Sequence, residues 1–188
     1  GSFWSRYLKV SEGCNEKCAY CTIPSIRGVL KSEPIGEIIS EAVTLIENGA
    51  VEICVISQDP TAYGMDIYGR PMLKELIHEF DRSLPEDIWV RLLYLHPKRL
   101  DRELLEMVYN SKVILPYLDI PLQHVNGTIL KSMNRIGSEQ EMKNIFRMAR
   151  QMDPLFALRT TLMVGYPGET EKEFQQLLDF LEEMELDR

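Results

Sequence analysis

The chain has 188 residues, of which 45% are hydrophobic and 27% charged, and its formal net charge is −8. This size and composition predict one globular domain with a buried core, and an acidic balance without any block of Lys or Arg argues against a direct nucleic-acid footprint on this segment. No apolar run approaches the ~18 residues of a membrane span and no signal peptide is visible, so we expect a soluble protein without membrane contact.

The first strand is expected at residues 7–10, and three cysteines follow it closely, Cys14, Cys18 and Cys21, in the spacing CxxxCxxC. Four thiolates normally hold a 4Fe-4S cluster, so a loop with three leaves one iron open to an outside ligand. Closed structural zinc sites use four protein ligands, commonly as two separated pairs, and no second pair follows here. The sequence therefore favours a cluster, with a zinc or electron-transfer module as the alternative. Because clustered thiolates fit a reducing compartment, we expect a cytoplasmic protein.

An amphipathic helix is expected after Pro34, closed by Asn48-Gly49, and a fully apolar strand follows at residues 52–57. Cys54 lies within that strand and is expected to be a buried thiol. Gln58 and Asp59 come at its end, where an amide and a carboxylate can hydrogen-bond a substrate or a cofactor. An Asx-type turn set by Asp59-Pro60 is the structural alternative, and the two are compatible.

The third and fourth strands, at residues 88–95 and 117–120, are each followed by a histidine. His96 follows the third strand directly, and Gln123-His124 lie just beyond the fourth. A histidine at such a position can donate hydrogen bonds or shuttle a proton. Neither has a visible partner for general-base catalysis, so we expect structural or substrate contacts and assign no catalytic residue. Short helices are expected at residues 72–80, 102–109 and 128–133.

The fifth strand, at residues 157–164, contains Arg159 and Thr161, which alternate along it and therefore point to the same face. Arg159 can bind an anionic group or pair with a neighbouring acid, and Arg135 is a second candidate for the same role. Gly165 begins a glycine turn after the strand, whose bare backbone can pass close to a flat ligand.

Strands that alternate with helix patterns are typical of repeated βα units and a parallel sheet, so the fold class is α/β. Two capping-box patterns, Ser138 with Glu141 and Thr170 with Glu173, open the helices on either side of the fifth strand. A closed eight-fold barrel takes about 250 residues, so five units predict a partial, open (β/α) TIM-like barrel, truncated at its C-terminal end. Reactive groups in such folds gather at the carboxyl ends of the strands.

The stretch from Cys14 to Cys21, with Tyr20 as the aromatic residue, resembles the radical S-adenosylmethionine (SAM) enzymes, whose signature is CxxxCx(aromatic)C. The resemblance implies that the three thiolates hold a 4Fe-4S cluster and that the amino and carboxylate groups of SAM chelate its open iron. Many of these enzymes hold the methionine amino group with a Gly-Gly-Glu-Pro-like stretch, from which Ser57-Gln58-Asp59-Pro60 departs. We expect SAM contacts from Tyr20, Gln58, Gln123, Arg135, Arg159, Thr161 and Gly165, and substrate contacts from Asp59, His96 and His124.

Longer stretches resemble the methylthiotransferase branch of that superfamily: residues 12–15, 23–28 and 164–171. Within the branch, Ser57-Gln58-Asp59 and Leu122-Gln123-His124 are similar to the enzyme that modifies an aspartate of a small-subunit ribosomal protein. Relatives that modify transfer RNA typically have Gly-Gln-Asn and Pro-Val-Gln-Ser there. A transfer-RNA adenosine methylthiotransferase is therefore the nearest alternative.

The resemblance implies that a 5′-deoxyadenosyl radical removes hydrogen from the β-carbon of the target aspartate, which then gains a methylthio group. It implies an electron donor of the flavodoxin or ferredoxin type. Residues 1–188 would be the core domain of a longer protein, without its auxiliary-cluster domain, which would hold a second cluster, and without its C-terminal RNA-binding-type domain. We therefore expect this segment to bind one cluster and SAM but not to complete sulfur insertion alone.

Overall fold

Five parallel strands form the centre of the structure, a computed structural model that describes residues 4–188. Three of them pair in the order β1 (Ser5–Lys9), β4 (Glu52–Ile56) and β5 (Trp89–Leu92), and β6 (Tyr117–Gln123) pairs with β7 (Ala157–Leu162). The amide of Leu95 donates to the Asp119 carbonyl over 2.8 Å, so the chain after β5 joins the two groups of strands. All five predicted strands are present, in sequence order across the sheet.

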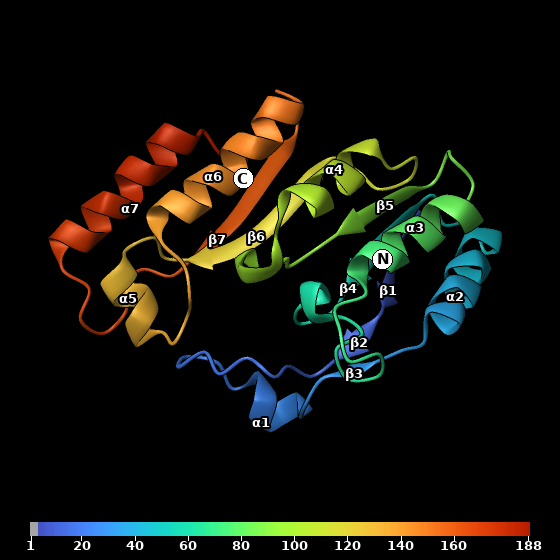
Figure 1. Ribbon diagram of the computed structural model, residues 1–188, viewed down its shortest axis with the longest axis horizontal. Coiled ribbons are helices and arrows are strands. Elements are labelled where there is room, and N and C mark those ends of the chain that lie inside the picture. The colour runs from blue at the N-terminus through green and yellow to red at the C-terminus, as the bar shows by residue number, and fades with distance from the viewer. Residues whose placement is uncertain (1–3) are drawn as a thin grey trace.

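The main helices lie side by side over the strands, each packed on the next (Figure 1). They are α2 (Ile35–Glu47), α3 (Leu73–Ser83), α4 (Arg102–Asn110), α6 (Glu139–Met152) and α7 (Glu171–Met184), with the shorter α5 (Gly127–Ser132) before α6. The predicted helix after Pro34 and the three predicted short helices are confirmed to within a few residues. None of the helices between residues 4 and 188 is long and apolar enough to cross a membrane.

Thr170 makes the predicted capping box at the start of α7, and its backbone amide donates to the Glu173 carboxylate. Ser138 caps α6 differently. Its hydroxyl accepts from the Glu141 amide and also donates to the Glu141 carboxylate over 2.9 Å, so the second bond comes from the hydroxyl and not from the backbone. Both patterns therefore mark true helix starts.

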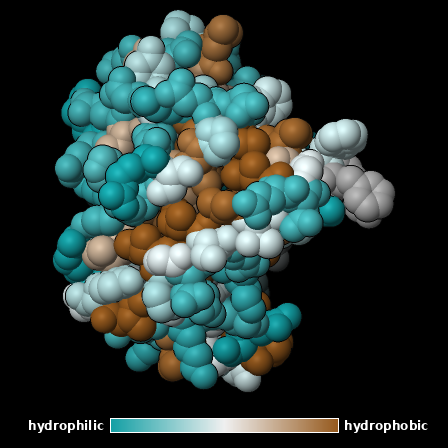
Figure 2. All heavy atoms as spheres, turned by 90° about the vertical axis from the view of Figure 1, so that its right-hand side faces the viewer, coloured by the Kyte–Doolittle hydropathy of each residue, from teal (hydrophilic) through white to brown (hydrophobic). Residues whose placement is uncertain are grey.

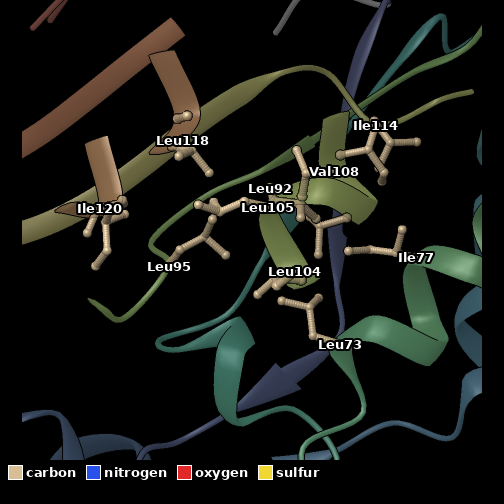
Figure 3. Packing of buried hydrophobic residues seen from close by; sticks show 14 of the residues in the cluster. Leu73, Ile77, Leu92, Leu95, Leu104, Leu105, Val108, Ile114, Leu118 and Ile120 are labelled. Atoms are coloured by element: carbon tan, nitrogen blue, oxygen red, sulfur yellow. The ribbon is translucent and has the colours of Figure 1, made fainter. Parts of the chain in front are cut away.

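The core lies between the strands and the helices, and Figure 3 shows leucines of β5 and β6 packed against α3 and α4. Leu92, Leu105 and Leu118 are at most 1% exposed. Each such side chain contributes about 1.5–3 kcal/mol by leaving water. Successive side chains of a strand point to opposite faces of the sheet. The face that does not contribute to this core therefore holds polar and charged groups, such as Arg91, which pairs with Glu52 over 2.8 Å.

β1 is the outer strand of its sheet, and Tyr7 within it is 70% exposed whereas Leu8 is fully buried. Figure 2 shows the side of the molecule where β1 and α2 lie, with a band of hydrophobic residues among hydrophilic ones.

A short antiparallel pair that the sequence did not predict, β2 (Ser11–Glu12) with β3 (Lys31–Ser32), closes the segment containing the three cysteines. That segment also includes the five-residue helix α1 (Ile23–Arg27). Gly13 has φ of 77°, and a Cβ on it would lie 2.2 Å from the Val29 carbonyl oxygen. The close approach of the two ends of the loop therefore requires glycine at this position.

Candidate functional site

A pocket of about 400 Å³ lies where the parallel strands end. The cysteine loop, the ends of β4 and β6, the segment after β5, and β7 all contribute to its lining, so the predicted gathering of polar groups at one rim is present. The predicted site residues that line it are Cys14, Cys18, Tyr20, Cys21, Gln58, Asp59, His96, Gln123, Arg135 and Thr161. Residues that sequence reasoning did not single out, Glu16 and Tyr94 among them, line it too.

The three clustered cysteines are free thiols, partly buried, and all face this one pocket. The amide of Glu16 donates to Cys14 Sγ over 3.4 Å. Burial raises the pKa of the Cys14 thiol, and this hydrogen bond opposes the rise. The fourth cysteine, Cys54, is only 8% exposed within β4, as predicted.

The cysteine loop is fixed by contacts with distant segments, because residues 13–18 form no helix or strand. Asn15 Oδ1 accepts from the Leu30 amide over 3.1 Å. At the other end, the Ala19 amide donates to the Met133 carbonyl over 2.9 Å, and Asn134 Nδ2 donates to the Lys17 carbonyl over 2.7 Å. The two halves of the loop are therefore held by different parts of the fold.

Arg135 lies beside the cysteine loop with part of its hydrogen-bonding capacity unused. Its Nη1 donates to the Tyr20 hydroxyl over 3.0 Å and lies 4.0 Å from Cys18 Sγ, and its Nη2 donates to the Pro121 carbonyl over 2.9 Å. Its Nε is buried without a partner. Burial raises the pKa of Tyr20 to about 12 despite the opposing charge of Arg135, so this phenol is neutral. A guanidinium at a pocket wall is suited to binding a carboxylate.

Arg99 joins the cysteine loop to the end of β4 through two carboxylates. It donates to Glu16 over 2.6 Å and to Asp59 over 2.8 Å. Burial by itself would raise the pKa of Glu16, but the hydrogen bond and charge of Arg99 outweigh it and lower the pKa. Asp59 also accepts from the Thr61 amide at the start of the 3-10 helix η1 (Pro60–Ala62), so the predicted Asx-type turn is confirmed. Arg99 and Glu16 are 83 residues apart, and no local pattern indicates their pairing.

His96 lies at the pocket wall as a neutral imidazole. Burial, assisted by the charge of Arg135, lowers its pKa to about 4. Its Nδ1 accepts from the Lys98 amide over 3.3 Å, at the start of the 3-10 helix η2 (Pro97–Arg99).

Two other pocket residues, Tyr94 and Gln123, have φ of 63° and 71°. Such left-handed backbone in residues other than glycine costs energy and is concentrated at functional sites.

Three predicted site residues do not line the pocket. Arg159 pairs with Asp119, a carboxylate with no exposed surface, over 2.8 Å. Burial raises the pKa of Asp119, and the charge of Arg159 opposes the rise. His124 is fully buried against Glu169, and the Gly165 amide donates to the same glutamate. Arg159 therefore links β7 to β6, His124 and Gly165 meet at Glu169, and none of the three lines the pocket.

The sequence matches a family of known proteins along almost its whole length. Residues 8–181 match the model of the radical SAM superfamily. The chain is 42% identical over 185 residues to the ribosomal protein uS12 methylthiotransferase RimO of Pelotomaculum thermopropionicum, covering 98% of this chain and 41% of the relative. The enzyme of the same name from Aeromonas salmonicida is 47% identical over 189 residues, covering 97% of this chain and 42% of the relative. The chain thus spans about two fifths of the length of these relatives.

Solved structures share the fold at much lower sequence identity. The radical SAM methyltransferase TsrM from Kitasatospora setae, solved with cobalamin and a [4Fe-4S] cluster bound, superimposes with a TM-score of 0.78 at 14% identity, covering 96% of this chain and 34% of that one. Coproporphyrinogen III oxidase (HemN) from Escherichia coli gives a TM-score of 0.68 at 17% identity, covering 98% of this chain and 42% of that one. The match of residues 8–181 to the family model establishes that this chain belongs to the radical SAM superfamily.

Proposed function

We propose that this chain is the radical SAM core of a methylthiotransferase whose target is an aspartate of the ribosomal protein uS12. The observation on which the proposal rests is that three thiols of one CxxxCxxC loop line a single pocket at the strand ends. The substrate is inferred from the relatives at 42% and 47% identity, whose names give uS12 and not transfer RNA as the target.

In this proposal Cys14, Cys18 and Cys21 hold a 4Fe-4S cluster. Among the described residues 4–188, no three or more His, Cys, Asp or Glu side chains surround a point where one metal ion could bind. Zinc would require all its thiolates within ~2.3 Å of one ion, whereas an iron–sulfur cluster takes each thiolate on a different iron. Three thiols of one loop that line a single pocket suit three irons of such a cluster.

SAM would lie in the same pocket, beside the cysteine loop. When bound there, the cluster and SAM supply the 5′-deoxyadenosyl radical that removes hydrogen from the aspartate β-carbon. Arg135 would bind the SAM carboxylate, because its guanidinium lies at the wall and its Nε has no partner. Gln58, Gln123 and Thr161 offer further hydrogen-bonding groups, and Tyr20 would lie beside the adenine ring of SAM.

The remaining architecture follows from the same proposal. Five parallel βα units in 188 residues support a partial, open barrel, truncated at the C-terminal end. We place an auxiliary-cluster domain and an RNA-binding-type domain in the longer protein, and a flavodoxin- or ferredoxin-type donor as its reductant. Free thiols that serve as cluster ligands are consistent with the cytoplasm.

Anaerobic reconstitution with iron and sulfide tests the proposal. We expect a brown protein with about four irons per chain that cleaves SAM when reduced. Substituting Cys14, Cys18 or Cys21 by serine should abolish cluster binding, whereas the matched C54S variant should retain it. A colourless chain that binds one zinc ion would refute the cluster. Mass analysis of uS12 and of transfer RNA from cells lacking the full gene would separate the two substrates.

A further inference from the structure

Arg99 forms a bridge between the cysteine loop and the end of β4. It donates from Nη2 to Glu16 and from Nη1 to Asp59, and the three side chains are 21%, 25% and 5% exposed. We propose that Arg99 is a positioning residue that holds Cys14 in place for cluster binding. The purpose of this bridge rests on the proposed function, but the bridge itself is a property of the chain without iron.

Glu16 transmits the effect of Arg99 to Cys14. Its backbone amide donates to Cys14 Sγ over 3.4 Å, while its carboxylate accepts from Arg99 over 2.6 Å. No strand or helix supports residues 13–18. The Cys14 amide donates to the Gly28 carbonyl over 3.2 Å and Asn15 accepts from the Leu30 amide, whereas Glu16 is tied to the rest of the fold through its side chain. Movement of Glu16 therefore displaces the hydrogen bond that orients the Cys14 thiol.

The other side of the bridge is rigid. Arg99 ends the 3-10 helix η2, and Asp59 caps the 3-10 helix η1 through the Thr61 amide over 3.0 Å. The planar guanidinium can bind two carboxylates in fixed directions, which a lysine ammonium on a flexible stem does less well. Arginine at this position therefore connects the loop to two strand ends at once.

The second half of the loop is held without Arg99. Ala19 and Lys17 bond to residues 133 and 134, and the Tyr20 hydroxyl accepts from Arg135. Loss of Arg99 should therefore loosen Cys14 and leave Cys18 and Cys21 in place. General destabilisation would expose all three thiols together.

Pulsed alkylation of the iron-free chain, followed by trypsin, measures this difference. Cleavage after Lys9, Lys17 and Arg27 places Cys14 in peptide 10–17 and the other two cysteines in peptide 18–27. In R99M we expect alkylation of Cys14 to be about tenfold faster, with less than about a twofold change in peptide 18–27. R99K should lie between R99M and the parent chain, because it restores the charge but not the fork.

Two further variants separate the bridge from its charge and from ordinary stability. E16Q removes a negative charge and R99M removes a positive one, so their electrostatic effects on the Cys14 thiol are opposite. Faster alkylation of Cys14 in both variants would therefore show that the loop around Cys14 has loosened. R91M is the matched control: Arg91 pairs with Glu52 over 2.8 Å at 26% and 21% exposure, but on the sheet and away from the loop. Alkylation of Cys14 in R91M should equal that in the parent chain.

Iron content after reconstitution completes the test, and we expect it to fall in R99M and remain unchanged in R91M. Unchanged alkylation of Cys14 in folded R99M and E16Q would overturn the role of Arg99, whether or not the parent chain binds a cluster. Faster alkylation in both variants with no iron bound by the parent would support the bridge and refute the proposed function. Should R99M fail to fold, R99K and E16Q give the same readout.

Discussion

His124 Nε2 lies 3.2 Å from Glu169 Oε1, and the two side chains are 0% and 4% exposed. His124 Nδ1 accepts from the amides of Val125 and Asn126, each over 2.9 Å, so the ring proton resides on Nε2 and is donated to Glu169. The other carboxylate oxygen accepts from the amides of Gly165 and Tyr166. This pair thus ties the glycine turn after β7 to the end of β6.

E169Q tests the pair. A carboxamide has one acceptor oxygen and a donor nitrogen, so it cannot accept from the imidazole and from both amides as the carboxylate does. Leaving such a buried group without a partner should lower the free energy of unfolding by about 1–3 kcal/mol. Urea denaturation measures the loss. E171Q, in the exposed first turn of α7, is the control and should change stability by less than about 1 kcal/mol.

The two candidate arginines for the SAM carboxylate should respond differently to lysine. R135K removes the planar donor from the pocket wall, so we expect SAM binding, measured per bound cluster, to weaken about tenfold or more. R159K keeps a cation beside Asp119, outside the pocket lining, and should leave SAM affinity within about twofold of the parent. Equilibrium binding to the reconstituted chain distinguishes them, and equal losses in both variants would contradict the assignment.

His96 should make stability fall as the solution is acidified. Its folded pKa of about 4 lies below the usual 6.5, so between these values the unfolded chain binds a proton that the folded chain does not. This contribution is fully present above pH 6.5 and is lost as the pH falls toward 4. Between pH 7 and pH 5, H96N should lose about 1–2 kcal/mol less than the parent in urea denaturation, since asparagine retains an acceptor for the Lys98 amide. Identical losses would show that His96 is not held neutral.

Gly13 should tolerate no side chain. A Cβ would lie 2.2 Å from a backbone oxygen of Val29, and φ of 77° is unfavourable for alanine. G13A should therefore lower the free energy of unfolding by about 1–3 kcal/mol and reduce iron bound on reconstitution. The control is G36A in α2, where a Cβ meets nothing within 4 Å. Its stability should be unchanged or higher by up to about 1 kcal/mol, because alanine favours a helix.

The sequence by itself determined the elements and the ligands that lie close together in the chain. Apolar periodicity located all five parallel strands, because strand and helix patterns arise from neighbouring residues. The spacing of Cys14, Cys18 and Cys21 identified the superfamily, because one loop supplies all three thiols. Strand ends are also local features, and their placement at one sheet edge put Gln58, Asp59 and Gln123 correctly into the pocket lining.

Only the tertiary structure decided which charged groups meet. Arg159 pairs with the buried Asp119, and His124 pairs with Glu169. The partners are 40 and 45 residues apart in the chain, so no local sequence pattern indicates that they meet. The bridge from Arg99 to Glu16, and the β2–β3 pair that closes the cysteine loop, were invisible for the same reason. Burial then sets the protonation of His96, since desolvation depends on what the folded chain places around a side chain and not on its neighbours in sequence.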